Sequence, residues 1–177
     1  MLTQFSVTNF QCIKEKATLD MRAIKLSEFK DTLINDRLLP VAAIYGPNGG
    51  GKSTLLRALF TLQRLVVKQF LSVKGTGPIS DIKMSDTSVV PFKFAPESAN
   101  KPTEFELFIE IEGIEYKYYM SIFDNKIVDE SLYFKKVESK VIKEVFSRHK
   151  NEITLGAVIK NEVKLVDNIA DEVPLFA

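Results

Sequence analysis

GPNGGGKS, residues 46–53, fits the pattern G-x-x-x-x-G-K-[ST] of a phosphate-binding loop, and this stretch decides the fold class of the chain. A loop that wraps phosphates turns its backbone N–H groups inward, which requires positive φ and no side chains in the way. The four glycines of the stretch suit that task. The pattern places the Lys52 ammonium against the β- and γ-phosphates of a nucleotide and the Ser53 hydroxyl on Mg²⁺.

The residues on either side of the loop fit a strand-loop-helix unit. Residues 41–45 are a continuous apolar run, which is typical of a parallel strand buried on both faces. Residues 54–67 predict a largely buried helix, and the Lys74-Gly75 sequence predicts that this helix ends near Val73. Phosphates would then lie at the helix N-terminus, where the helix dipole favours an anion. A glycine-rich turn that happens to contain Lys-Ser is the alternative.

The sequence therefore predicts ATP and Mg²⁺ as cofactors. The residues expected to hold the nucleotide are Asn48, Gly49, Gly50, Gly51, Lys52, Ser53 and Thr54, with Ser53 also serving as the metal ligand. No catalytic residue is assigned.

Composition limits the other classes of function. With 177 residues and 45% apolar composition, the chain can bury one ordinary core. Its 24 Lys and Arg nearly balance its 23 Asp and Glu, so the net charge does not indicate a nucleic-acid or membrane partner. The single Cys12 fits a reducing compartment, and we interpret it as a small buried or strand residue rather than a nucleophile. Without a signal peptide or a spanning apolar run, a cytoplasmic protein is expected.

Hydrophobic alternation predicts strands on both sides of the loop. Residues 5–8 and 17–21 indicate two half-buried antiparallel strands, and residues 24–35 indicate a loop with one helical turn. Alternation begins again at Val89, in residues 92–94, and continues through residues 105–122, with turn signals at Gly113, Asp124-Asn125 and residues 149–151. Turns so closely spaced predict an antiparallel β-meander over residues 89–166 rather than βαβ units.

The predicted fold class is therefore α/β (α+β): a P-loop NTPase N-terminal lobe with an antiparallel β-meander subdomain. We place the nucleotide-binding lobe in residues 1–82 and the β-subdomain in residues 83–177.

Three further groups of residues have a structural and a functional interpretation. The basic series is read as a solvated face, with a nucleic-acid patch as the alternative; its members are Lys135, Lys136, Lys140, Lys143, Arg148 and Lys150. The tyrosines could stack bases, but their place in a period-two strand favours core and rim packing; they are Tyr116, Tyr118 and Tyr119. The only histidine, His149, lies in a predicted turn without neighbouring carboxylates, which favours a surface position over a metal site.

Two stretches together resemble a known family. These are FSVTNF, residues 5–10, and LPVAAIYGPNGGGKSTLLRAL, residues 39–59. They resemble the N-terminal lobe of the ABC/SMC/RecF class of ATPases, and most closely the bacterial AAA-type, OLD-related ATPases of phage-defence and abortive-infection systems. The resemblance covers residues 1–60, and a looser similarity to the β-subdomain of those proteins runs from Phe105 to Phe134. This chain departs from the family at Gln11, where members carry Arg or Lys, and at Gly50, where they carry Ser or Ala.

The resemblance implies a partner and an output. Complete heads of this class bind two ATP molecules between two protomers, so a homodimer or a partner ATPase lobe is expected. Opening of that dimer by hydrolysis would control a nuclease, a toxin or a DNA-bound effector.

Hydrolysis in this class needs a carboxylate for Mg²⁺ and a Glu for water, both at the end of a buried strand. The candidate pairs are Asp129-Glu130 and Asp171-Glu172, each preceded by only two apolar residues. No Gln follows Gln69, and no Ser-Gly-Gly signature is present. We therefore expect this chain to bind ATP but hardly to hydrolyse it.

Two alternatives stay open on the sequence. A small-molecule kinase of the nucleotide-kinase type carries a similar loop, but it has the loop near its N-terminus and an Arg-rich lid, whereas Arg148 is the only Arg after Arg64 here. A nucleotide-binding regulatory module without chemistry is the other.

Overall fold

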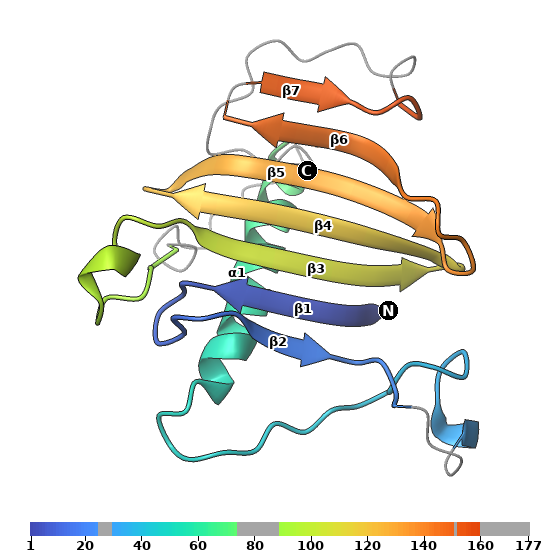
Figure 1. The fold of residues 1–177 in the computed structure, drawn as a ribbon, viewed down its shortest axis with the longest axis horizontal. Helices are drawn as coiled ribbons and strands as arrows, with labels where there is room; N and C mark the ends of the chain where they lie inside the picture. The colour runs from blue at the N-terminus through green and yellow to red at the C-terminus, as the bar shows by residue number, and fades with distance from the viewer. Residues whose placement is uncertain (25–29, 74–88, 151, 160–177) are drawn as a thin grey trace.

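The computed structural model describes residues 1–24, 30–73, 89–150 and 152–159. In these residues seven strands form one sheet in the order β2-β1-β3-β4-β5-β6-β7, and α1 crosses one face of it (Figure 1). The described residues contain no helix with the length and apolarity that a membrane crossing requires. The fold is thus a mixed one, with a helix packed on a sheet.

The bounds of the elements follow the alternation and the helical period of the sequence. The strands are β1 (Leu2–Thr8), β2 (Ala17–Asp20), β3 (Thr103–Ile111), β4 (Ile114–Phe123), β5 (Lys126–Lys136), β6 (Lys143–His149) and β7 (Glu152–Leu155). The helix α1 is Lys52–Val73, and short 3-10 turns are η1 (Lys30–Thr32) and η3 (Pro96–Ser98). Both strands predicted before the loop are confirmed, and they pair antiparallel with Phe5 opposite Leu19.

Every neighbouring pair of strands in the sheet is antiparallel. The turn between β3 and β4 contains Gly113 with φ of 76°, and the turn between β4 and β5 contains Asp124 and Asn125 with φ of 50° and 58°. Both turns lie where the sequence predicts them, because these residue types accept positive φ at low cost. β1 lies between β2 and β3, so the sheet joins sequence from both sides of the phosphate loop.

The core lies between α1 and the face of the sheet that it covers. Val7, Phe105 and Met120 form a buried row across β1, β3 and β4, and Leu62 of α1 packs in the same cluster. The helix predicted over residues 54–67 is confirmed, and α1 is described as far as Val73, the last described residue before residue 89. It is not largely buried, however. Among the described residues the sheet covers one face of α1, apolar residues on its other face are exposed, and Phe60 is 61% exposed.

The buried parallel strand predicted over residues 41–45 is not found. These residues form no strand, they have no backbone hydrogen bond to another part of the described chain, and Val41 and Tyr45 are 75% and 90% exposed. Figure 1 shows this stretch outside the sheet, on the way from β2 to α1. A strand buried on both faces needs parallel neighbours. All seven strands in the described residues pair antiparallel, and neither edge strand, β2 or β7, pairs with residues 41–45.

Residues 89–94 also form no strand, although their alternation predicts one. Their backbone bonds instead to the connection between β1 and β2, through Gln11 N and Val90 O at 2.8 Å. Alternation indicates an extended chain, and only a pairing partner makes it a strand. The predicted Asp171-Glu172 pair lies outside the described residues.

Candidate nucleotide-binding site

The phosphate loop is an exposed turn closed by a lysine. Gly49 and Gly51 have φ of 80° and 82°, a region that side-chain-bearing residues rarely adopt. The Lys52 ammonium donates hydrogen bonds to the carbonyls of Gly46 and Pro47, each at 2.7 Å. Lys52 therefore reaches back across the loop to its first two residues, and its charge lies over the surface that the loop encloses.

The helix after the loop presents an N-terminus suited to an anion. α1 begins at Lys52, and its first turn contains no acidic residue. The first helical hydrogen bond runs from Leu55 N to Gly51 O at 2.9 Å, which leaves the preceding amide groups without intrahelical acceptors. The dipole adds partial positive charge at this end. Loop and helix together can bind a chain of phosphates.

Magnesium fits this site through one protein oxygen. Ser53 is exposed in the first turn of α1, and the described residues contain no cluster of three His, Cys, Asp or Glu side chains able to hold a metal. Mg²⁺ in nucleotide sites keeps several waters and takes only one or two protein ligands beside the phosphates. Ser53 would hold the ion, which supplies neutralising charge to the phosphate oxygens when bound.

The hairpin of residues 9–14 packs beside the phosphate loop. Phe10 and Ile13 exchange two backbone hydrogen bonds of 2.8 Å, which leaves Gln11 and Cys12 at the tip. The Cys12 thiol lies 3.1 Å from the Thr54 hydroxyl. Cys12 is exposed, so its predicted burial is wrong. Period-two patterning gave no sign of this hairpin, because its position depends on contacts with α1.

A buried asparagine anchors the hairpin on its other side. The Asn9 amide donates to the carbonyls of Ser98, Lys101 and Pro102 at 2.8 to 3.1 Å, and its side-chain oxygen accepts from Phe92 N at 3.0 Å. Asn9 has φ of 54°, which Asn tolerates better than most residues. These bonds fix the hairpin to residues 92–102, so one short turn contacts both the phosphate loop and the start of β3.

The predicted Asp129-Glu130 pair is not part of this site. Neighbouring residues in a strand point to opposite faces of the sheet. Glu130 is 1% exposed and accepts a 2.7 Å hydrogen bond from the Tyr118 hydroxyl, opposite the buried Arg148. Asp129 lies on the other face, 2.5 Å from His149 Nδ1. The candidate pair therefore does not act as a unit, which agrees with the expectation of little hydrolysis. Arg148 corrects the prediction of a solvated basic face, because it is buried. His149 is exposed as predicted, although it has a carboxylate partner that the sequence did not indicate.

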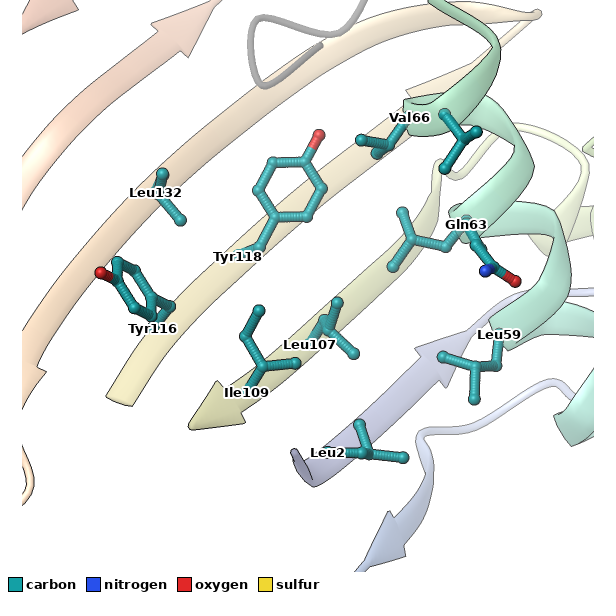
Figure 2. A pocket seen from close by; sticks show the side chains of 11 residues that line it. Leu2, Leu59, Gln63, Val66, Leu107, Ile109, Tyr116, Tyr118 and Leu132 are labelled. Atoms are coloured by element: carbon teal, nitrogen blue, oxygen red, sulfur yellow. The ribbon is translucent and has the colours of Figure 1, made fainter. Parts of the chain in front are cut away.

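A separate cavity of about 360 Å³ lies between α1 and the sheet (Figure 2). Its labelled side chains come from α1, β1, β3, β4 and β5, and they are almost all apolar; they are Leu2, Leu59, Gln63, Val66, Leu107, Ile109, Tyr116, Tyr118 and Leu132. Lys and Arg are absent from this lining, so the cavity does not suit phosphates. The phosphate loop remains the candidate site.

A comparison with protein families supports that assignment. Residues 41–165, more than two thirds of the chain, match a family model whose description reads "AAA domain, putative AbiEii toxin, Type IV TA system". The match includes the phosphate loop, α1 and the strands from β3 to β7. No curated protein matches the chain. With its P-loop sequence, its glycine turn and a match of this extent, the chain belongs to this AAA-domain family of P-loop ATPases.

Proposed function

We propose that this chain binds ATP with Mg²⁺ through residues 48–54 and forms the ATP-binding lobe of an ABC/SMC-type ATPase. The observation that carries the proposal is the exposed glycine loop at the start of α1. There Lys52 reaches across the loop, Ser53 is accessible, and no acid stands in the first helical turn. Amide donors, a mobile cation and a hydroxyl are the three parts that a nucleotide and its metal require.

The proposed output is control of an effector by ATP-driven pairing of two lobes. The description of the family names a putative toxin and a type IV toxin–antitoxin system, and this supports the proposed context of phage defence. We extend that context to this chain. A second copy or a partner lobe would close over the nucleotide, and its opening would act on a nuclease, a toxin or a DNA-bound protein.

Residues 41–45 support a lobe that is completed by other strands. They lead directly into the phosphate loop and are apolar, yet Val41 and Tyr45 are largely exposed. Burying this segment between neighbours would remove apolar surface from water, at about 25 cal/mol per Å². In this proposal residues 1–82 form the nucleotide lobe, and residues 83–177 form the β-subdomain.

The kinase alternative has less support. A kinase of this size closes an Arg-rich helical lid over the phosphates. Between residues 89 and 159 the described chain contains five strands and one 3-10 turn. Its Arg148 is buried in the sheet rather than exposed near the loop.

Mass measurement in the presence of nucleotide tests the proposal. Light scattering after size exclusion should show a larger particle with ATP and Mg²⁺ than with ADP or without nucleotide. Ser53→Ala should lose this shift, because it removes the metal ligand, while Thr154→Ala, which removes an exposed hydroxyl on β7, should keep it. A particle mass that stays unchanged at saturating ATP would contradict the pairing of lobes.

A further inference from the structure

Arg57 places an exposed guanidinium beside the start of α1. It follows Ser53 by four residues and Thr54 by three, so these side chains share one face of the helix. Long side chains on a helix lean toward its N-terminus, so the Arg57 side chain is directed toward the turn that contains Ser53 and Thr54. The exposed Arg57 has no carboxylate within ion-pair distance in the described chain.

The tip of the hairpin holds this guanidinium. Arg57 Nη1 donates a 3.0 Å hydrogen bond to Gln11 Oε1. The next hairpin residue, Cys12, contacts Thr54, and its sulfur lies 3.7 Å from where a side chain on Gly51 would begin. Gln11 has φ of 50° and its amide bonds to Val90 O, so its backbone is fixed. Arg57 is therefore held by a rigid turn that already touches the phosphate loop.

The position along the loop indicates which phosphate is near. Lys52 serves the β- and γ-phosphates and Ser53 the metal between them. The backbone amides of such a loop cradle the α- and β-phosphates, so the α-phosphate would lie nearest Thr54, the next residue along the chain. The same hairpin contacts Thr54 through Cys12 and Arg57 through Gln11. A guanidinium carries five N–H donors, and only one is used in the bond to Gln11.

We propose that Arg57, held by Gln11, is a second cationic contact to the bound nucleotide, directed at its α-phosphate. This inference rests on the proposed function, because it specifies the ligand contact of the same site. Arg suits the role because its planar fork matches phosphate oxygens and its charge is permanent. The contact adds to that of Lys52 and does not replace it, since the two cations lie on different parts of the triphosphate.

Nucleotide affinities of charge variants test the contact. Arg57→Gln should weaken the binding of ATP and of ADP by the same factor, about three- to tenfold for a partly exposed charge-assisted bond. Arg57→Lys should recover part of that affinity. Gln11→Ala should weaken nucleotide binding less than Arg57→Gln does, because the charged Arg57 guanidinium is still present. Lys143→Gln, which removes an exposed cation on β6, is the control and should leave both affinities unchanged. Equal melting temperatures would show that Arg57→Gln is folded.

Alkylation of Cys12 gives an independent readout, because it is the only cysteine. Saturating ATP with Mg²⁺ should slow its reaction with iodoacetamide in the wild type, and Lys52→Ala should abolish this protection at the same ATP concentration. An unchanged rate in the wild type at saturation would overturn the placement of the hairpin at the nucleotide.

The outcomes separate the inference from the proposed function. Loss of ATP affinity without loss of ADP affinity in Arg57→Gln would move the contact to the γ-phosphate and overturn the assignment. Unchanged affinities in that variant, with binding abolished by Lys52→Ala, would overturn the inference and leave the proposed function standing. A wild type that binds neither nucleotide would overturn both.

Discussion

Tyr118 and Glu130 face each other from neighbouring strands in the interior of the sheet, where the tyrosine hydroxyl donates a 2.7 Å hydrogen bond to Glu130 Oε1. Burial is the main cause that raises the pKa of Tyr118 well above its ordinary value, and the nearby Glu130 carboxylate raises it further. Arg148 lies opposite Glu130 in β6 and is 3% exposed. Buried polar groups of this kind keep their place only when they are partnered.

Tyr118→Phe should destabilise the fold by about 1–3 kcal/mol, because it removes a donor from a buried carboxylate while keeping the ring. Urea unfolding followed by circular dichroism measures the change. Tyr45→Phe is the matched control, since Tyr45 is exposed, and its unfolding midpoint should equal that of the wild type. An equal midpoint for Tyr118→Phe would show that the bond contributes nothing to stability.

Stability should fall in alkali, and Tyr118 should be one cause. A group whose pKa is raised by folding contributes its full stability below the unfolded pKa, and this contribution is lost as the pH rises above it. The ordinary tyrosine value is 10.0, so the loss begins near pH 10. Burial and Glu104 also raise the pKa of Tyr119 to about 12, which extends the effect. Unfolding midpoints at pH 9, 10 and 11, chosen to bracket this onset, should fall less steeply for Tyr118→Phe than for the wild type. Parallel curves would contradict the assignment to Tyr118.

The exposed segment of residues 41–45 should make the chain associate with itself. Apolar extended chain without strand neighbours is a template for pairing with another chain. Sedimentation across a wide concentration range should show species above the monomer in the absence of nucleotide. Val41→Lys should reduce them, whereas Val141→Lys, at an exposed apolar position between β5 and β6, should not. A monodisperse monomer that binds no hydrophobic dye would count against this prediction.

Phosphate release by this chain should be close to background even where ATP binds. The only described Asp-Glu pair is divided between the two faces of the sheet, with Glu130 buried against Tyr118. Phosphoryl transfer depends almost entirely on positioning and electrostatics, so loss of water orientation removes several kcal/mol of catalysis. A coupled phosphate assay with Lys52→Ala as the blank measures the rate. Turnover that depends on Lys52 would refute the expectation, and Glu130→Gln would then show whether this acid takes part.

Local signals in the sequence predicted much of the fold. The glycine loop, the helix over residues 54–67, β1, β2 and the turns at Gly113 and Asp124-Asn125 depend on residues close together in the chain, and all are found where expected. The strand predictions for residues 41–45 and 89–94 were wrong, because a strand also depends on distant pairing partners that the local sequence pattern does not reveal.

The surroundings of the site were harder to predict. Cys12 and Gln11 reach α1 through a hairpin whose anchor, Asn9, bonds to residues some ninety positions away. No periodic pattern encodes such bonds. The separation of Asp129 and Glu130 could have been foreseen, because successive side chains in a regular strand point to opposite faces.

Calorimetric titration of ATP with Mg²⁺ into the wild type and Lys52→Ala tests the central claim most directly. Lys52 supplies the cation that closes the phosphate loop through the Gly46 and Pro47 carbonyls. Its removal should weaken binding by at least about 1.5–3 kcal/mol, the scale of a charge-assisted hydrogen bond. The account predicts saturable binding to the wild type and a loss of this size in the variant. Equal affinity of the two proteins for ATP would contradict it.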